Sequence, residues 1–433
     1  MKVLIVNTNQ KAGGAAVAAG RLLASLNNSG VRAKMLVVEK TDEDINVVGL
    51  SDTSGKRRGH GGLRQRWHFL YERLTVFLRL HMKREHLFEI DLANSGTDIT
   101  RLPVFKEADV VHLSWVNQGM LSLPVIRKIV ASGKPVVWTL HDLWPVSGIC
   151  HYARGCNRFK SCCQRCPLLP GGGSEKDVAY QVWQKKKAIY GKGKIKFVAC
   201  SKWLEGQARQ SGLTEASDVT SIPNPIDTAV FRPTDKRKAK AALGIDAEKR
   251  VVLFVSQRVT DQRKGMEYLA TATELLKETL GEQAADIVVA ILGGHSDEVA
   301  ERLALPSVAL GYVEDEAKIA AIYNAADVFV LPSLEDNLPN TIMEAMACGV
   351  PTVGFKVGGI PERIDHMKNG YVARPRDAED LAAGIRWALY EADKEDVKAE
   401  ALKKVSINYS QNRVAMKYIE IYNHELALRH YIL

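Results

Sequence analysis

Short apolar runs alternate with longer amphipathic segments along almost the whole chain. Runs rich in Val, Ile and Leu are typical of buried strands, whereas apolar residues that recur every three or four positions are typical of helices. The predicted strands are Val3–Asn7, Ala33–Val38, Val110–Leu113, Val136–Leu140, Lys196–Cys200, Val251–Ser256, Ile287–Leu292, Val308–Leu310, Val328–Leu331 and Thr352–Phe355. The predicted helices include Ala15–Leu26, Leu123–Ala131, Met266–Leu280, Glu316–Ala325 and Ile342–Cys348. Strands that alternate with helices predict a parallel α/β architecture.

The pattern forms two complete sets, and 433 residues exceed what one hydrophobic core usually organises. Pro223 and Pro225 flank Asn224 between the sets, and neither neighbouring element continues through such a segment. We therefore predict a Rossmann-like domain over residues 1–222, a second over residues 223–410, and a C-terminal helix over residues 411–433 that crosses back to the first domain. Ligands of open parallel sheets lie beyond the carboxyl ends of the strands, so we expect a cleft where the sheets face each other.

Composition places the chain among globular proteins, with 46% apolar and 25% charged residues. The N-terminus is apolar for only a few residues, unlike a signal peptide, and no run of about 18 apolar residues could span a bilayer. We therefore expect a cytoplasmic protein, with the inner face of the plasma membrane as a candidate location.

A basic segment runs from Lys56 to Arg84, with Leu and Phe interleaved at roughly helical spacing. Such a segment suits the surface of an anionic membrane. The alternative is a solvated helix that packs its Leu and Phe face on the core. Nucleic acid is not expected as a partner, because no recognised nucleic-acid motif accompanies the charge.

The strongest candidate site follows the predicted strand Val328–Leu331. An acidic loop with Glu335 and Asp336 leads into a helix that begins near Asn340 and Thr341. Free backbone N–H groups at a helix start bind phosphate. Glu344 lies one turn further, where its carboxylate could accept hydrogen bonds from ribose hydroxyls, and Asp336 could face a donor sugar.

Two further loops after strands suit a nucleotide diphosphate. Arg258 and Lys264 are six positions apart, and two cations on one loop can converge on a diphosphate. Gly293 and Gly294 follow the strand Ile287–Leu292, where glycines let the backbone approach a ligand closely.

The first domain has two candidate segments of the same kind. Gly13 and Gly14 follow the first strand and open a helix, although they do not form a dinucleotide-binding fingerprint. His141 follows the strand Val136–Leu140 and is followed by Asp142, so we expect this pair to point into the cleft.

Glu344-Ala345-Met346-Ala347-Cys348-Gly349-Val350-Pro351 matches, without a gap, a motif of glycosyltransferase family 4, and agreeing segments run from the N-terminus to about residue 390. The chain resembles these retaining enzymes, which have the GT-B fold. The family has a second acidic residue eight positions before Glu344. Asp336 occupies that position here, whereas the family usually has Glu, and the adjacent Glu335 is the alternative.

The resemblance implies transfer of a sugar from a nucleotide-sugar donor with retention of anomeric configuration. It places the phosphate-binding cations at Arg258 and Lys264, the base near Tyr312, and the contact to the transferred sugar at His141. It implies a glycine-rich loop at Gly13 and Gly14 near donor phosphate and acceptor, and no metal for catalysis. The expected acceptor is a saccharide or lipid-linked saccharide, as in bacterial surface polysaccharide biosynthesis.

A cysteine-rich insertion follows His141, at about residues 148–170. In a reducing cytoplasm, clustered cysteines favour a metal site over disulfides. The candidate ligands of a structural zinc are Cys150, Cys156, Cys163 and Cys166, with Cys162 or His151 as substitutes; disulfides or free thiols are the alternative. Cys200 and Cys348 are predicted to be buried packing residues.

Two rival functions remain open at this point. A nucleotide-sugar epimerase could share the two-domain build and would isomerise a sugar without an acceptor. A zinc-dependent binding module for nucleic acid or membrane would use the cysteine-rich and basic segments, but it leaves the second domain unexplained.

Overall fold

The computed structural model describes residues 1–51, 61–191 and 195–430. The chain forms two compact units. The first contains residues 1–224 and the C-terminal helix from Val414, and the second extends from Pro225 to Arg413. Residues 56–60 of the predicted basic segment lie outside the described residues.

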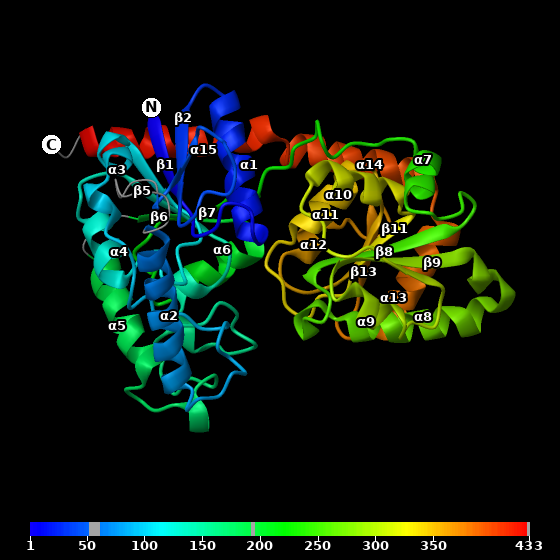
Figure 1. Cartoon of the computed structure of the whole chain (residues 1–433), viewed down its shortest axis with the longest axis horizontal. Coiled ribbons are helices and arrows are strands. Elements are labelled where there is room, and N and C mark those ends of the chain that lie inside the picture. Colours follow the sequence, from blue (N-terminus) through cyan, green and yellow to red (C-terminus); the bar gives the residue numbers. More distant parts are fainter. Residues whose placement is uncertain (52–60, 192–194, 431–433) are drawn as a thin grey trace. The chain divides into compact units, whose positions relative to one another are not determined.

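The first unit is built on a seven-stranded parallel sheet of order β3-β2-β1-β4-β5-β6-β7 (Figure 1). Its strands are β1 Lys2–Val6, β2 Arg32–Val37, β3 Val47–Gly49, β4 Val110–Leu113, β5 Val136–Leu140, β6 Ile195–Ala199 and β7 Val219–Ser221. Its helices are α1 Gly14–Asn28, α2 Gly61–Arg79, α3 Pro103–Glu107, α4 Leu123–Val130, α5 Val178–Tyr190, α6 Lys202–Arg209 and α15 Gln411–His430.

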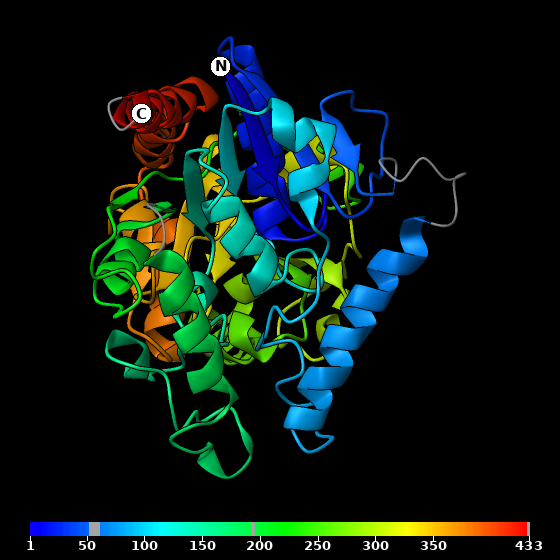
Figure 2. The same ribbon diagram turned by 90° about the vertical axis from the view of Figure 1, so that its left-hand side faces the viewer.

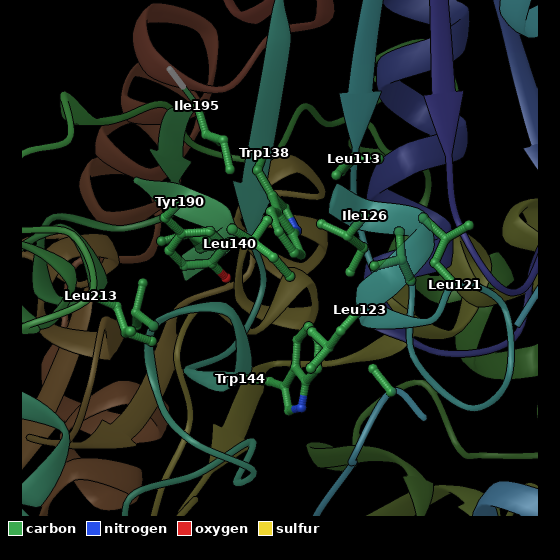
Figure 3. Packing of buried hydrophobic residues seen from close by; sticks show 14 of the residues in the cluster. Leu113, Leu121, Leu123, Ile126, Trp138, Leu140, Trp144, Tyr190, Ile195 and Leu213 are labelled. Atoms are coloured by element: carbon green, nitrogen blue, oxygen red, sulfur yellow. The ribbon is translucent and has the colours of Figure 1, made fainter. Parts of the chain in front are cut away.

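Successive residues of a strand point to opposite faces, so each face of this sheet has its own core. Leu4 and Val6 of β1 belong to the larger cluster, which includes Trp138, Trp144 and Tyr190 (Figure 3). The Tyr190 hydroxyl donates to the Pro145 carbonyl at 2.6 Å, which ties α5 to the loop after β5. That loop is therefore packed rather than solvated.

The opposite face is covered by α1 and the C-terminal helix α15. Tyr418 and Tyr422 of α15 are buried with Val3 and Ile5 of β1 in one cluster. The Tyr422 hydroxyl lies 2.5 Å from His112 Nδ1, and Thr139 bonds both the other ring nitrogen of His112 and the Tyr418 hydroxyl. The last helix of the chain thus completes the first unit.

The second unit has a six-stranded parallel sheet of order β10-β9-β8-β11-β12-β13 (Figure 1). Its strands are β8 Arg250–Arg258, β9 Ile287–Gly294, β10 Ser307–Ala309, β11 Val328–Leu331, β12 Thr352–Phe355 and β13 Gly370–Ala373. Its helices are α7 Lys236–Ala242, α8 Met266–Leu280, α9 Ser296–Ala300, α10 Glu316–Ala325, α11 Asn340–Ala347, α12 Ile360–Arg363, α13 Ala378–Arg386 and α14 Lys394–Asn408.

The prediction of two parallel, Rossmann-like α/β sheets is confirmed. In both sheets the strand order reverses beside the first strand, between β1 and β4 and between β8 and β11. Such a switch point leaves a crevice at the carboxyl ends of the strands, because the connections leave in opposite directions. Among the helices described, none is long and apolar enough to cross a membrane.

Candidate functional site

An ion pair marks the switch point of the second sheet. Lys264, in the turn after β8, lies with Nζ 2.5 Å from Oδ2 of Asp336, in the loop after β11. Burial would raise the pKa of Asp336, but Lys264 and Arg263 outweigh it and hold the pKa below its usual value. The structure therefore brings together two predicted catalytic residues, as a buried carboxylate with its cation.

Arg263 completes this cluster and is the residue that sequence reasoning missed. Its Nη1 lies 3.6 Å from Oδ2 of Asp336 and donates to the Glu335 carbonyl at 2.9 Å. Spacing alone singled out Arg258 and Lys264, but it is Arg263 that joins Lys264 in linking the loop after β8 to the loop after β11. A basic residue directly before the predicted Lys264 was the signal that could have found it.

Two glycines allow the loops around Asp336 to pack against each other. Gly265 has a φ of +70°, and a Cβ there would lie 1.9 Å from the Pro332 carbonyl oxygen. Gly358, in the loop after β12, has a φ of +52°, and its Cβ would lie 1.7 Å from the Asp336 carbonyl oxygen. Any other residue at either position would push the loops apart.

The helix α11 begins at the same edge of the sheet, with Asn340 and Thr341 in its first turn. No side chain caps this end, because Pro339 occupies the N-cap position. Thr341 Oγ1 is buried and has no hydrogen-bond partner in the part of the chain that the structure describes. A buried polar atom without a partner is costly, so this end of the helix suits a ligand with acceptor oxygens.

Glu344 is buried one turn into α11, where a surface helix residue would be exposed. The Tyr323 hydroxyl of α10 donates to Glu344 Oε2 at 3.1 Å. A buried, oriented carboxylate can accept hydrogen bonds from a diol such as ribose.

The other predicted donor residues end neighbouring strands of the same sheet. Gly293 and Gly294 end β9, and a Cβ on Gly293 would lie 1.9 Å from the Ser256 carbonyl oxygen. Arg258 is exposed at the end of β8, where its Nε donates to Thr260 Oγ1 at 3.2 Å. Tyr312, which follows β10, is 51% exposed. Among the described residues, none of these four forms a hydrogen bond or ion pair with Asp336, so they share the edge of the sheet but not the cluster around Asp336.

The predicted residues of the first unit lie at the switch point of its own sheet. Gly13, with a φ of +92°, caps α1 after β1, and Gly14 is the first residue of that helix. His141 follows β5, and its Nε2 lies 3.0 Å from Ser114 Oγ, which follows β4. Burial lowers the pKa of His141 to about 4, so its ring is neutral at pH 7.

A buried charge network begins beside His141. Asp142 Oδ2 and Asp91 Oδ2 each lie 2.8 Å from a different ring nitrogen of His151. Burial would lower the pKa of His151, but Asp142 and Asp91 outweigh it and raise the pKa to about 10. The ring is therefore an imidazolium. Trp115 Nε1 also donates to Asp142, at 2.9 Å, so this network fixes the residue next to His141.

The cysteine-rich insertion contains a small pocket lined in part by the four predicted zinc ligands, which are Cys150, Cys156, Cys163 and Cys166. All four are free thiols, and burial raises the pKa of Cys150 to about 11. Among the described residues, no three His, Cys, Asp or Glu side chains are grouped so that they could hold a metal ion. His151, a predicted substitute ligand, is instead bound by two carboxylates. Cys200 and Cys348 are buried, as predicted.

A comparison with known protein families finds a match within the second unit. The family described as glycosyl transferases group 1 matches residues 249–391. The chain is 30% identical over 183 residues to D-inositol 3-phosphate glycosyltransferase 2 of Catenulispora acidiphila, covering 40% of this chain and 42% of that protein. It is 26% identical over 215 residues to the sulfoquinovosyl transferase of Arabidopsis thaliana, covering 48% and 40%. The chain thus spans less than half the length of these relatives.

Solved structures match over the whole chain. Sucrose-phosphate synthase of Thermosynechococcus elongatus has a TM-score of 0.66 and 19% identity and covers 99% of both chains. Anabaena HepE, solved in complex with UDP and glucose, has a TM-score of 0.63 and 17% identity and covers 98% of this chain and 99% of its own. At these identities the likeness concerns the fold alone, which is GT-B-like.

Proposed function

The chain belongs, through residues 249–391, to the glycosyl transferases group 1 family, and on that premise we propose that it transfers a sugar from a nucleotide-sugar donor with retention of configuration. The observation that carries the proposal is the convergence of Lys264, Asp336 and the uncapped start of α11 at one switch point. The acceptor that we propose is a saccharide or lipid-linked saccharide in surface polysaccharide biosynthesis, with the enzyme at the cytoplasmic face of the membrane.

The donor diphosphate binds, in this proposal, at the start of α11. Backbone N–H groups of Asn340 and Thr341 and the Thr341 hydroxyl supply donors, and Lys264 and Arg258 supply positive charge. Charge builds on the departing diphosphate as the sugar bond breaks, so these groups stabilise the transition state more than the ground state. This division of roles needs no catalytic metal.

The nucleoside and the sugar occupy the residues on either side of the diphosphate. Glu344, oriented by Tyr323, accepts the ribose hydroxyls, and Tyr312 with Gly293 and Gly294 lies near the base. The carboxylate that faces the sugar is that of Asp336 in this proposal, and the Glu335 carboxylate is the alternative. Arg263 donates to the backbone carbonyl of Glu335 and not to its side chain. In the first unit, the proposal assigns His141 to the transferred sugar and Gly13 and Gly14 to donor phosphate and acceptor.

The reaction that we propose exchanges one bond at the anomeric carbon. The acceptor oxygen bonds to that carbon on the face from which the diphosphate oxygen leaves, through an oxocarbenium-like state. The acceptor proton passes to the departing diphosphate. Neutral His141, bonded to Ser114, can donate or accept a hydrogen bond at the sugar without adding a charge.

A ligand screen tests the donor site directly. The purified chain is heated with UDP, GDP, ADP and their sugar conjugates, starting with UDP-glucose because HepE was solved with UDP and glucose. A ligand that binds only the folded protein raises the apparent melting temperature. We expect a rise with one nucleotide family that is lost in Glu344→Gln. A rise of equal size in Glu344→Gln would refute the assignment of Glu344 to the ribose. In a separate assay without acceptor, isomerisation of the donor sugar would identify the chain as an epimerase instead.

We also propose that Cys150, Cys156, Cys163 and Cys166 bind a structural zinc ion. The support is that all four line one pocket and that the Gly148 N–H donates to Cys163 Sγ at 3.2 Å, as backbone amides do at thiolate ligands. Zinc would have to draw the four sulfurs together, since they are not grouped as ligands here. Cys163→Ser should lower zinc content and melting temperature together, whereas Cys162→Ser, outside the pocket lining, should change neither. Wild-type protein whose melting temperature stays the same after zinc has been removed with a chelator would reject the proposal.

A further inference from the structure

Helix α2 exposes a continuous apolar stripe. Thirteen large hydrophobic side chains are exposed in the described part of the chain, and seven of them lie between residues 63 and 82. Trp67 and Leu70, for example, are 65% and 58% exposed. The stripe consists of Leu63, Trp67, Leu70, Tyr71, Leu74 and Leu78. Steps of three and four residues place these side chains on one face of the helix.

The opposite face of α2 is bound firmly to the first unit. The Glu72 carboxylate accepts from the backbone N–H groups of Leu92 and Ala93 at 3.2 and 2.7 Å. Arg73 forms a buried ion pair with Asp91, and Val76 is fully buried. The loop at Gly119 approaches so closely that a Cβ there would lie 2.6 Å from the Phe69 backbone nitrogen. Figure 2 shows α2 along the outside of the unit. Because these contacts hold the opposite face, the exposed side chains of the stripe face away from the unit.

Positive charge accompanies the stripe at both ends. Arg64 and Arg66 are exposed near its start, and Arg79, Lys83 and Arg84 near its end. The one acidic residue between positions 62 and 84 is Glu72, which is buried. None of the five cations forms an ion pair within the described residues. The exposed face of α2 is therefore apolar and cationic, and the first exposed carboxylate, Glu85, follows Arg84 beyond the end of the helix.

We propose that α2 docks the protein on the surface of an anionic lipid bilayer. An interfacial helix buries its apolar face at the boundary of headgroups and acyl chains, and its cations attract anionic headgroups. Trp67 and Tyr71 suit that boundary, because their rings are apolar with one polar atom. Nineteen helical residues span about 28 Å, which lets the stripe lie flat along the surface.

The charges favour a bilayer over a second copy of the chain. A two-fold dimer would pair the stripe with itself and bring five cations of each copy together, with Glu85 as the one exposed carboxylate beside them. Anionic lipid supplies the missing counter-charge. This inference does not depend on the identity of the sugar donor.

Vesicle flotation of the full chain tests the inference. Vesicles of phosphatidylcholine alone are compared with vesicles that also contain phosphatidylglycerol. We expect the wild type to float with the anionic vesicles and to be released by salt. Leu70→Ser with Leu74→Ser should weaken this binding at least about tenfold, because in the wild type both leucine side chains move from water into the apolar part of the bilayer. Arg64→Ser with Arg66→Ser should weaken it about 25-fold, from about fivefold for each charge.

The matched control changes two apolar residues outside α2 that are at least about as exposed, at 85% for Ile45 and 55% for Ile407. Ile45→Ser with Ile407→Ser should bind as the wild type does, since these side chains lie in the turn before β3 and on α14, outside the stripe. Unchanged binding of the Leu70 and Leu74 variant, or equal binding of the wild type to both vesicles, would overturn the inference. A wild-type dimer in sedimentation that the Leu70 and Leu74 variant loses would assign the stripe to a second copy and overturn it as well.

Discussion

Replacement of His151 by glutamine is the sharpest test of the electrostatics of the first unit. The wild-type ring lies between Asp91 and Asp142, with both nitrogen–oxygen distances at 2.8 Å and the side chain almost completely buried. Glutamine keeps a hydrogen-bonding group of similar length but carries no charge. The variant therefore leaves two buried carboxylates with less positive charge to balance them.

Two independent considerations give the same size of effect. Removal of one partner from a buried ion pair costs about 3–5 kcal/mol. The rise of the His151 pKa from 6.5 to about 10 corresponds to about 5 kcal/mol of preference for the protonated ring. Because this folded-state pKa is raised, the stabilisation is fully present below pH 6.5 and is lost as the pH rises toward about 10. We expect His151→Gln to cost several kcal/mol near neutral pH and much less near pH 10.

Urea unfolding followed by tryptophan fluorescence measures this cost. Six of the seven tryptophans, all except Trp387, lie in the first unit, so the signal reports its unfolding. His86→Gln is the matched control. Its ring pairs with Glu89 at 3.0 Å but is partly exposed, so its loss should cost less than about 1 kcal/mol. A cost for His151→Gln that equals this control, or that is the same at neutral pH and near pH 10, would refute the reasoning.

Three further predictions concern the second unit. Thr341→Val should weaken nucleotide binding by roughly two- to tenfold in a titration without lowering the melting temperature, because the hydroxyl has no partner in the described structure; unchanged affinity would exclude a ligand contact. Lys264→Met should lower kcat/KM at least about a hundredfold and also reduce stability, since it leaves the buried Asp336 carboxylate with Arg263 at 3.6 Å; wild-type turnover would remove Lys264 from the site. Gly293→Ala should lower the free energy of unfolding by more than about 2 kcal/mol, because its Cβ would lie 1.9 Å from the Ser256 carbonyl, whereas Gly206→Ala, on open helix surface, should be neutral or stabilising; equal effects would contradict the close approach.

The α/β fold could be predicted because its signal is local. Each central strand is a short run of apolar residues, and β4, β5, β11 and β12 have the predicted bounds. Three strands were not predicted, namely β3, β7 and β13. All three strands lie at the edges of the sheets. Strands β3 and β7 are only three residues long, and each of the three strands contains positions that are only half-buried. A short edge strand is defined by its neighbour more than by its own sequence.

The candidate site could be predicted at the level of loops but not of contacts. Polar residues directly after the predicted strands lie at one edge of the second sheet, because the carboxyl ends of all its parallel strands meet there. Which cation meets Asp336 depends on the path of the turn at residues 262–264, and spacing alone therefore favoured the exposed Arg258 over Arg263. Spacing alone also does not say which face of a helix meets the core. The helical spacing of the basic segment therefore left open whether its leucines face a membrane or the core. The structure faces Leu70 and Leu74 outward and packs Val76 and Leu80 inward, so the alternative of a helix that packs its Leu face on the core does not hold for Leu70 and Leu74.

The Lys264–Asp336 pair shows how backbone freedom at two glycines produces a charged site. Gly265 and Gly358 let the loops after β8 and β12 reach the carbonyls of Pro332 and Asp336, at distances that a Cβ would prevent. This packing buries Asp336, and burial makes its charge depend on Lys264 and Arg263. The carboxylate in turn holds Lys264 in one position before any donor arrives, so that less side-chain freedom remains to be lost on binding. On this reasoning, Asp336→Asn should impair donor binding even if Asp336 never contacts the sugar.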